Sequence, residues 1–102
     1  MPKFFLAFRG GMPKSPDEGQ KMMADWNAWV AGLGPALTDK GAGFGKSRFL
    51  TAPGVEGTVT GALSGYTLIE AADIEAALAI ANKNPIFNLG GTIEVAPVME
   101  MS

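Results

Sequence analysis

Apolar residues recur with two different periods along the chain, and these periods predict its first elements. The run 3–9 is short, rich in aromatic residues and closed by Gly10, which is typical of a strand. After it, Ser15 can cap a helix and Glu18 completes a capping box, so the sequence predicts a helix over 16–33. The apolar stripe of this helix consists of Met22, Trp26, Trp29, Val30 and Leu33.

Glycine and proline interrupt the middle of the chain. The Gly34-Pro35 step is expected to kink the helix, whose final turn then reaches Asp39, and the continuity of the helix across this step stays open. Beyond it, the pattern predicts a glycine-rich loop over 41–45, a strand over 46–51 whose charges suit a sheet edge, and a long loop over 52–65.

The last third of the chain predicts two more strands and a second helix. The strands cover 66–71 and 92–98, and between them Asp73 caps a helix that stops at Asn84-Pro85. The order β-α-β-β-α-β predicts an α+β fold of the ferredoxin-like type, with a four-stranded, mostly antiparallel sheet and both helices on one face. At 102 residues, we expect a single domain over 1–102.

Strand side chains alternate between the two faces of a sheet, so the pattern assigns residues to each face. One face is almost wholly apolar and is expected to lie under the helices: Phe4, Leu6, Phe8, Ile69, Ile93 and Val95. The second face is mixed but too apolar for water: Phe5, Ala7, Arg9, Tyr66, Leu68, Glu70, Glu94, Ala96 and Val98. Because two helices cannot cover both faces, we expect a homodimer through the second face; the alternative is a monomer that leaves this face in solvent.

Composition excludes several classes of function. The net charge of −2 argues against binding to nucleic acid. The absence of cysteine and histidine excludes disulfides, thiolate sites and Ser-His-Asp triads, and the carboxylates lack metal-ligand spacing, so we expect no metal and no cofactor. The apolar run 4–8 is too short for a signal peptide or a membrane helix, which favours a soluble, cytoplasmic protein.

Charged residues of the second face form the candidate site. If strands 3–9 and 66–71 are central and parallel, with 92–98 antiparallel beside the first, Arg9 lies near Glu70 and Glu94. Such a cluster can hold a polar ligand or raise the pKa of one carboxyl for proton transfer, or it can be a structural group of ion pairs. The candidate catalytic residues are Glu94, Glu70 and Arg9, and the candidate ligand-binding residues are Arg9, Tyr66, Glu70, Glu94 and Phe44.

Two further motifs have plainer explanations. The stretch 41–45 and the basic residues after it offer amides and positive charge to an anion, but they lack phosphate-loop spacing, and a simple turn is favoured. Trp26 and Trp29, with Met22 and Met23 before them, are compatible with the wall of a cofactor pocket, but a core stripe is favoured.

Taken in order, five segments resemble the YCII-related (DGPF-type) domain family of dimeric α+β barrels. They are Phe5–Gly11, Trp26–Trp29, Gly41–Gly45, Gly65–Ala71 and Gly90–Val95. The resemblance implies a ferredoxin-like protomer and a homodimer. Some members are proposed enzymes with a His–Asp pair, but this chain has no histidine, and Arg9 stands where some relatives carry one. It also has Asn84-Pro85 where Asp-Pro-Phe is frequent, so that pair is not carried over.

Three functions therefore stay open. The first is a dimer that binds a small polar molecule in a cleft near the second face, which the lack of histidine and cysteine favours. The second is a small proton-transfer enzyme, isomerase-like or lyase-like, that uses a glutamate with Arg9; this rests on analogy between folds. The third is a structural or regulatory protein that acts through its surfaces.

Overall fold

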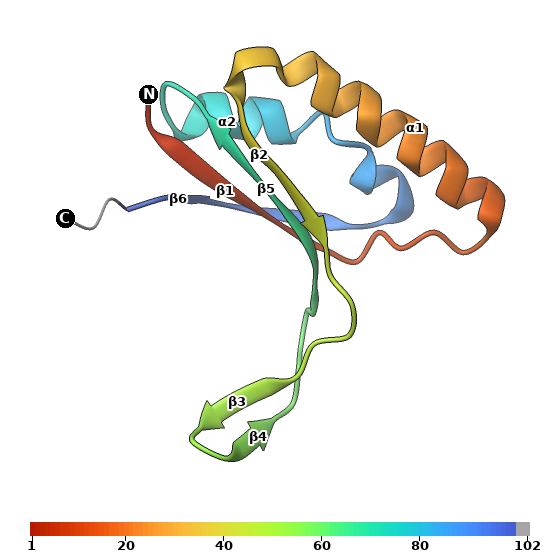
Figure 1. Ribbon diagram of the computed structural model, residues 1–102, viewed down its shortest axis with the longest axis vertical. Helices are drawn as coiled ribbons and strands as arrows, with labels where there is room; N and C mark the ends of the chain where they lie inside the picture. The colour runs from red at the N-terminus through yellow and green to blue at the C-terminus, as the bar shows by residue number, and fades with distance from the viewer. Residues whose placement is uncertain (100–102) are drawn as a thin grey trace.

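The computed structural model describes residues 1–99, with one four-stranded sheet, helices on one side of it and a separate two-stranded hairpin (Figure 1). In chain order the elements are β1 (Lys3–Arg9), α1 (Pro16–Leu33), η1 (Gly34–Ala36), β2 (Leu37–Gly43), β3 (Phe49–Ala52), β4 (Val55–Gly57), β5 (Leu63–Glu70), α2 (Ile74–Ala81), η2 (Pro85–Leu89) and β6 (Thr92–Pro97). The domain predicted for 1–102 also includes 100–102, which lie outside the described residues.

The main sheet has the order β2-β5-β1-β6, and every neighbouring pair is antiparallel. This order confirms the α+β, ferredoxin-like arrangement with β1 and β5 in the centre. The prediction that these two central strands are parallel is wrong. The crossover through α1 returns the chain so that β2 runs parallel to β1. The segment that contains β3 and β4 then reverses the chain direction, so β5, which lies between β2 and β1, is antiparallel to both.

Both α-helices begin at their predicted caps. Ser15 Oγ accepts a hydrogen bond from the Glu18 amide at 3.1 Å, and Glu18 Oε1 accepts one from the Lys14 amide at 2.7 Å. At the second helix, Asp73 Oδ1 accepts a hydrogen bond from the Ala76 amide at 2.9 Å. These bonds satisfy amides that have no partner within the helix, which confirms both predicted helix starts.

After α1 the chain departs from the prediction. Gly34 has φ +55°, and a short 3-10 turn leads directly into β2 at Leu37, so the expected helical turn up to Asp39 is wrong. Gly41 and Gly43 belong to this strand and not to a loop. Because β2 is an edge strand with mostly exposed residues, its sequence lacks the apolar alternation by which strands are recognised.

The predicted strand over 46–51 is confirmed only in its second half, 49–51, and its expected place in the main sheet is wrong. Instead, β3 begins at Phe49 and pairs with β4, outside the main sheet. The predicted long loop over 52–65 contains all of β4 and the start of β5. Gly54 and Gly57 lie in the β3–β4 hairpin, which projects from the sheet (Figure 1), and they give the stretch the composition of a loop.

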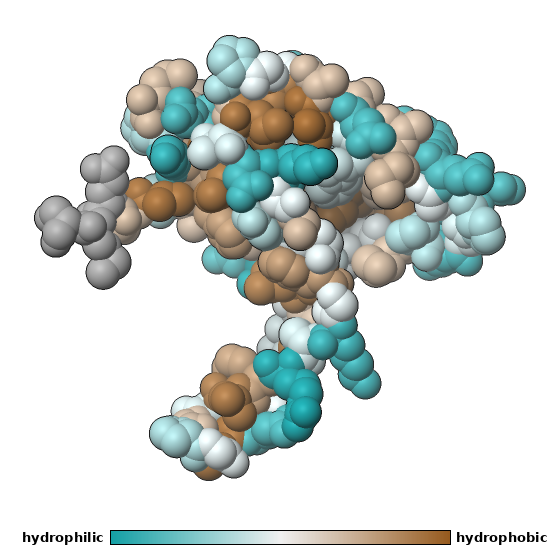
Figure 2. Space-filling view, viewed as in Figure 1, coloured by the Kyte–Doolittle hydropathy of each residue, from teal (hydrophilic) through white to brown (hydrophobic). Residues whose placement is uncertain are grey.

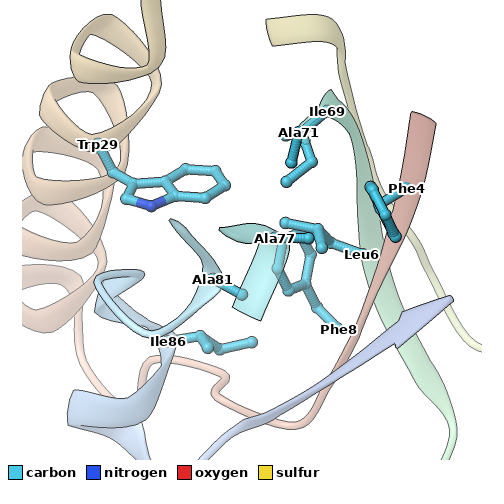
Figure 3. Close-up of a cluster of buried hydrophobic side chains, with 9 residues drawn as sticks. All are labelled: Phe4, Leu6, Phe8, Trp29, Ile69, Ala71, Ala77, Ala81 and Ile86. Atoms are coloured by element: carbon cyan, nitrogen blue, oxygen red, sulfur yellow. The ribbon is translucent and has the colours of Figure 1, made fainter. Parts of the chain in front are cut away.

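The core lies between the sheet and the helices (Figure 3). Its buried members are Phe4, Leu6, Phe8, Trp29, Ile69, Ala71, Ala77, Ala81 and Ile86, with Ile93 and Val95 packed against them. Phe8 meets the rings of Trp26 and Trp29 edge to face, at centroid distances of 4.9 and 6.5 Å. The predicted apolar face therefore lies under the helices, as expected.

Candidate functional site

The second face of the sheet, called here the open face, has no helix over it in the subunit (Figure 1). In its middle the small residue Ala7 lies opposite Tyr66 on one side and Glu94 on the other. Residues directly opposite on antiparallel strands share a face, so these three side chains form one row across β5, β1 and β6. The row brings together two of the predicted site residues.

Arg9 forms two side-chain hydrogen bonds at one end of the open face. Its Nη1 donates to Glu94 Oε1 at 2.7 Å, and its Nε donates to the Gly61 carbonyl at 2.8 Å. The predicted pairing of Arg9 with Glu94 is confirmed. The two side chains are 35% and 66% exposed, so in the single subunit this pair is well solvated and contributes at most about 1 kcal/mol.

The predicted placement of Glu70 beside Arg9 is wrong. Glu70 lies opposite Lys3, at the other end of β1. Six residue positions separate Lys3 from Arg9, which is about 20 Å along a strand. The antiparallel direction of β5 is the cause, since a parallel strand would have carried Glu70 to the Arg9 end. A catalytic role for Arg9 and Glu94 stays a prediction. Glu70 lies too far from Arg9 to act together with this pair.

Tyr66 is the centre of an aromatic stack on the open face. Its ring lies 5.4 Å from that of Phe5 and 5.8 Å from that of Phe44, both nearly parallel to it. Its hydroxyl donates to Asp39 Oδ2 at 3.1 Å. The candidates Tyr66 and Phe44 therefore lie together. No sequence signal singles out Asp39, because the pattern predicts a helical turn at this residue, whereas it lies on β2 beside β5.

The contact with Asp39 raises the pKa of Tyr66. The hydrogen bond has the largest effect, the negative charge of the Asp39 carboxylate adds to it, and desolvation acts in the same direction. All three favour the neutral phenol over the phenolate.

We expect the Asp39→Asn variant to lower the pKa of Tyr66 toward its ordinary value, because the amide carries no charge. Tyr66 is the only tyrosine, so ultraviolet absorbance of the phenolate reports this group alone. Since the pKa is higher in the folded than in the unfolded chain, the stabilising effect is complete below about pH 10 and is lost as the pH rises through the folded pKa. Asp25→Asn is the control, because Asp25 pairs with Lys21. An unchanged titration in Asp39→Asn would show that the carboxylate does not act on Tyr66.

A cavity of about 590 Å³ lies on the opposite side of the sheet, between α1 and the β2 and β5 strands. Its apolar wall includes Phe8, Met22, Met23, Trp26, Val30 and Ile86. The facing wall is backbone-rich at Gly41 and Gly43, and Asn27, Lys40 and Ser64 supply polar groups. Ser64 already donates its hydroxyl to the Gly10 carbonyl at 3.0 Å, which leaves its oxygen free to accept.

The cavity involves only one of the predicted ligand-binding residues, Tyr66. One feature of the sequence points to the cavity, the stripe that contains Met22 and Trp26, but its helical spacing predicts a place in the core. The structure divides this stripe: Trp29 is 9% exposed and belongs to the core, whereas Trp26 is only partly buried and lines the cavity.

A second cavity of about 880 Å³ lies between α1 and the α2–η2 segment. It is bordered by several asparagines and by charged residues. Within residues 1–99 no cluster of acidic side chains has the geometry of a metal site. In the same range, no helix has the length and apolarity that crossing a membrane requires.

Neither a family model nor a curated protein matches the chain. Among solved structures it is similar to 5-chloro-2-hydroxyhydroquinone dehydrochlorinase (TftG) from Burkholderia phenoliruptrix AC1100, in complex with 2,5-dihydroxybenzoquinone. The TM-score is 0.61 with 15% sequence identity, over 96% of this chain and 95% of that chain. At this identity the similarity shows the fold alone, and it agrees with the α+β fold described above, a four-stranded antiparallel sheet with two helices.

Proposed function

We propose that this protein binds a small planar ring compound with polar substituents in the cavity between α1 and the β2–β5 strands. The observation that carries the proposal is the cavity itself. Its volume of about 590 Å³ lies in the range of small-molecule sites, and its wall is mainly apolar with a few polar groups. The solved structure with a similar fold holds a compound of this class, 2,5-dihydroxybenzoquinone.

The walls suit a flat ring for two reasons. Trp26 presents aromatic surface, and Met22 beside it is a flexible side chain with a polarizable sulfur, which adapts to ring edges. On the other side, Gly41 and Gly43 bring backbone close without intervening side chains. Asn27 and Lys40 then offer hydrogen bonds to carbonyl or hydroxyl groups of the ligand.

Binding without turnover is the form of this function that the residues favour. The chain has no histidine and no cysteine, the usual general base and thiol nucleophile. Arg9 and Glu94, the pair expected to transfer protons, do not line the cavity. The alternative of a proton-transfer enzyme would need this pair to be desolvated by a partner subunit.

The test is isothermal titration with 2,5-dihydroxybenzoquinone. We expect one site per chain and a dissociation constant of about 0.1–1 mM, which is usual for a compound of this size. Met22→Trp places a larger and stiffer ring in the cavity and should weaken binding about tenfold or more.

The matched control is Ala28→Trp, which introduces the same indole side chain beside the second cavity and should change the dissociation constant by less than about twofold. Absence of binding to the unaltered chain, or equal affinity in both variants, would contradict the proposal. If the ultraviolet spectrum of the compound stays unchanged for hours in the presence of the protein, the compound is not converted, which supports binding without catalysis.

We also infer that the protein is a homodimer paired through the open face. Phe5, Leu68 and Ala96 lie on this face and stay partly exposed in the single subunit. Burying apolar area of this kind stabilises by about 25 cal/mol per Å², so a few hundred Å² contribute several kcal/mol. The pairing also desolvates Arg9 and Glu94. Membership in the YCII-related family is a further proposal, supported by the order of the five sequence segments and by the fold; a cytoplasmic location is proposed as well.

A further inference from the structure

The β3–β4 hairpin stands away from the rest of the subunit as an arm, defined here as residues 44–62 (Figure 1). Every residue of the arm is exposed except Gly57, which is half-buried. Within residues 1–99, β3 and β4 contact each other and have at most sparse contacts with the other elements. An isolated two-stranded hairpin is at best marginally stable in water, so this arm needs a surface to pack against.

The tip of the arm is apolar. Phe49, Leu50 and Val55 are 51%, 65% and 52% exposed, and Figure 2 shows hydrophobic residues gathered there. The charges next to them are already satisfied, because Arg48 forms an ion pair with Glu56, which lies opposite Leu50. A surface that is apolar and carries neutralised charges is suited to protein contact and not to solvent.

The base of the arm is attached to the open face. On one side Arg9 Nε donates to the Gly61 carbonyl at 2.8 Å, and on the other side Phe44 stacks on Tyr66. Both partners belong to the open face. The arm therefore bends to the side of the sheet away from the helices, which is the side that lacks a cover (Figure 1).

The shape of the subunit agrees with a missing partner. Its radius of gyration is 14.9 Å, whereas a compact chain of this length has about 13 Å. Its accessible surface is 6999 Å², whereas a compact monomer of 10.6 kDa exposes about 5,500 Å². The excess of about 1,500 Å² is the area that one subunit of an obligate homodimer usually buries.

We propose that the arm clasps a second copy of this chain, with Phe49, Leu50 and Val55 packed against the flank of the partner. This rests on the proposed pairing through the open face. Paired sheets lie about 10 Å apart, and the extended segment 44–48 alone reaches about 17 Å, so the tip passes the plane of the opposite sheet. Two-fold symmetry then places each arm on the other copy and covers both arms at once.

The first test is a photo-crosslink from the tip. Because the chain has no cysteine, Leu50→Cys provides one attachment point for a benzophenone maleimide. Subunits with natural and ¹⁵N-enriched nitrogen are unfolded together in urea, refolded as a mixture, illuminated and digested. We expect crosslinked peptides that join the two isotopic forms; crosslinks only within one form, or none, would overturn the proposal. Leu78→Cys, exposed on α2, is the control and should give no mixed crosslinks.

The second test shortens the arm and separates its contribution from that of the sheet. Replacing 47–59 by an Asn-Gly turn should raise the dimer dissociation constant in sedimentation equilibrium by about a hundredfold. Leu68→Asp, on the open face, should also raise it, whereas Leu78→Asp should not. An unchanged constant in the shortened chain with a loss in Leu68→Asp would overturn the arm and leave the pairing intact. A monomeric unaltered chain would overturn both.

Discussion

Replacement of Phe8 by alanine is expected to lower the free energy of unfolding by about 4 kcal/mol. The Phe8 side chain is 2% exposed and lies between the sheet and α1, where it meets Trp26 and Trp29 edge to face. Alanine would remove the ring from both contacts and leave a cavity that the rigid sheet cannot close. The total free energy of unfolding of a small domain is only about 5–15 kcal/mol, so this loss is a large part of the total.

Thermal unfolding followed by circular dichroism at one fixed protein concentration measures the effect. We expect the midpoint to fall by about 20 °C. Fixed concentration matters because a dimer gains apparent stability by mass action. Phe87→Ala is the matched control: it removes the same ring at a position that is 45% exposed, and it should cost about 1 kcal/mol. Equal losses in the two variants would show that Phe8 is not in the core.

Gly41→Ala is expected to cost about 3–4 kcal/mol, from two separate causes. Gly41 has φ +76°, a conformation that residues with a Cβ atom rarely adopt. In addition, a Cβ atom there would overlap the carbonyl oxygen of Tyr66 on the neighbouring strand. The backbone of β2 would have to move away from β5, and with it one wall of the ligand cavity, so ligand affinity should fall as well.

Gly90→Ala separates these causes. Gly90 has the same φ of +76°, but no atom lies near the position of an added Cβ. It should therefore show only the conformational cost of about 1–2 kcal/mol, with ligand affinity unchanged. Urea unfolding of both variants at equal concentration gives the comparison. Equal costs would contradict the close approach of β2 and β5 at this position.

The elements that face the core were predictable from the sequence. The strand at Lys3–Arg9 and the helix at Pro16–Leu33 bury a regular set of side chains, so their apolar period is strong. The second helix could be recognised by the Asp73 cap. In contrast, β2 is a polar, glycine-containing edge strand, and β3 lies in a projecting arm. Neither element buries a face in the subunit, so neither carries a period that reveals its place.

The candidate site was predictable to the same degree. Arg9 and Glu94 could be placed together because β1 and β6 were both recognised and their antiparallel direction was correctly expected. Glu70 was misplaced because the direction of β5 depends on where β2 lies, and β2 was not recognised. The same error hid Asp39 and the Gly41–Gly43 wall of the cavity.

The sequence alone determined the α+β class, the two α-helices and the division of the central strands into a helix-covered face and an open face. These properties follow from local periodicity and capping, which act over a few residues along the chain. Only the tertiary structure decided the direction of β5, the cavity beside Trp26 and the projection of the arm. Each of these depends on contacts between segments far apart in the chain, such as Arg9 with Gly61 and Gly41 with Tyr66, for which local patterns carry no signal.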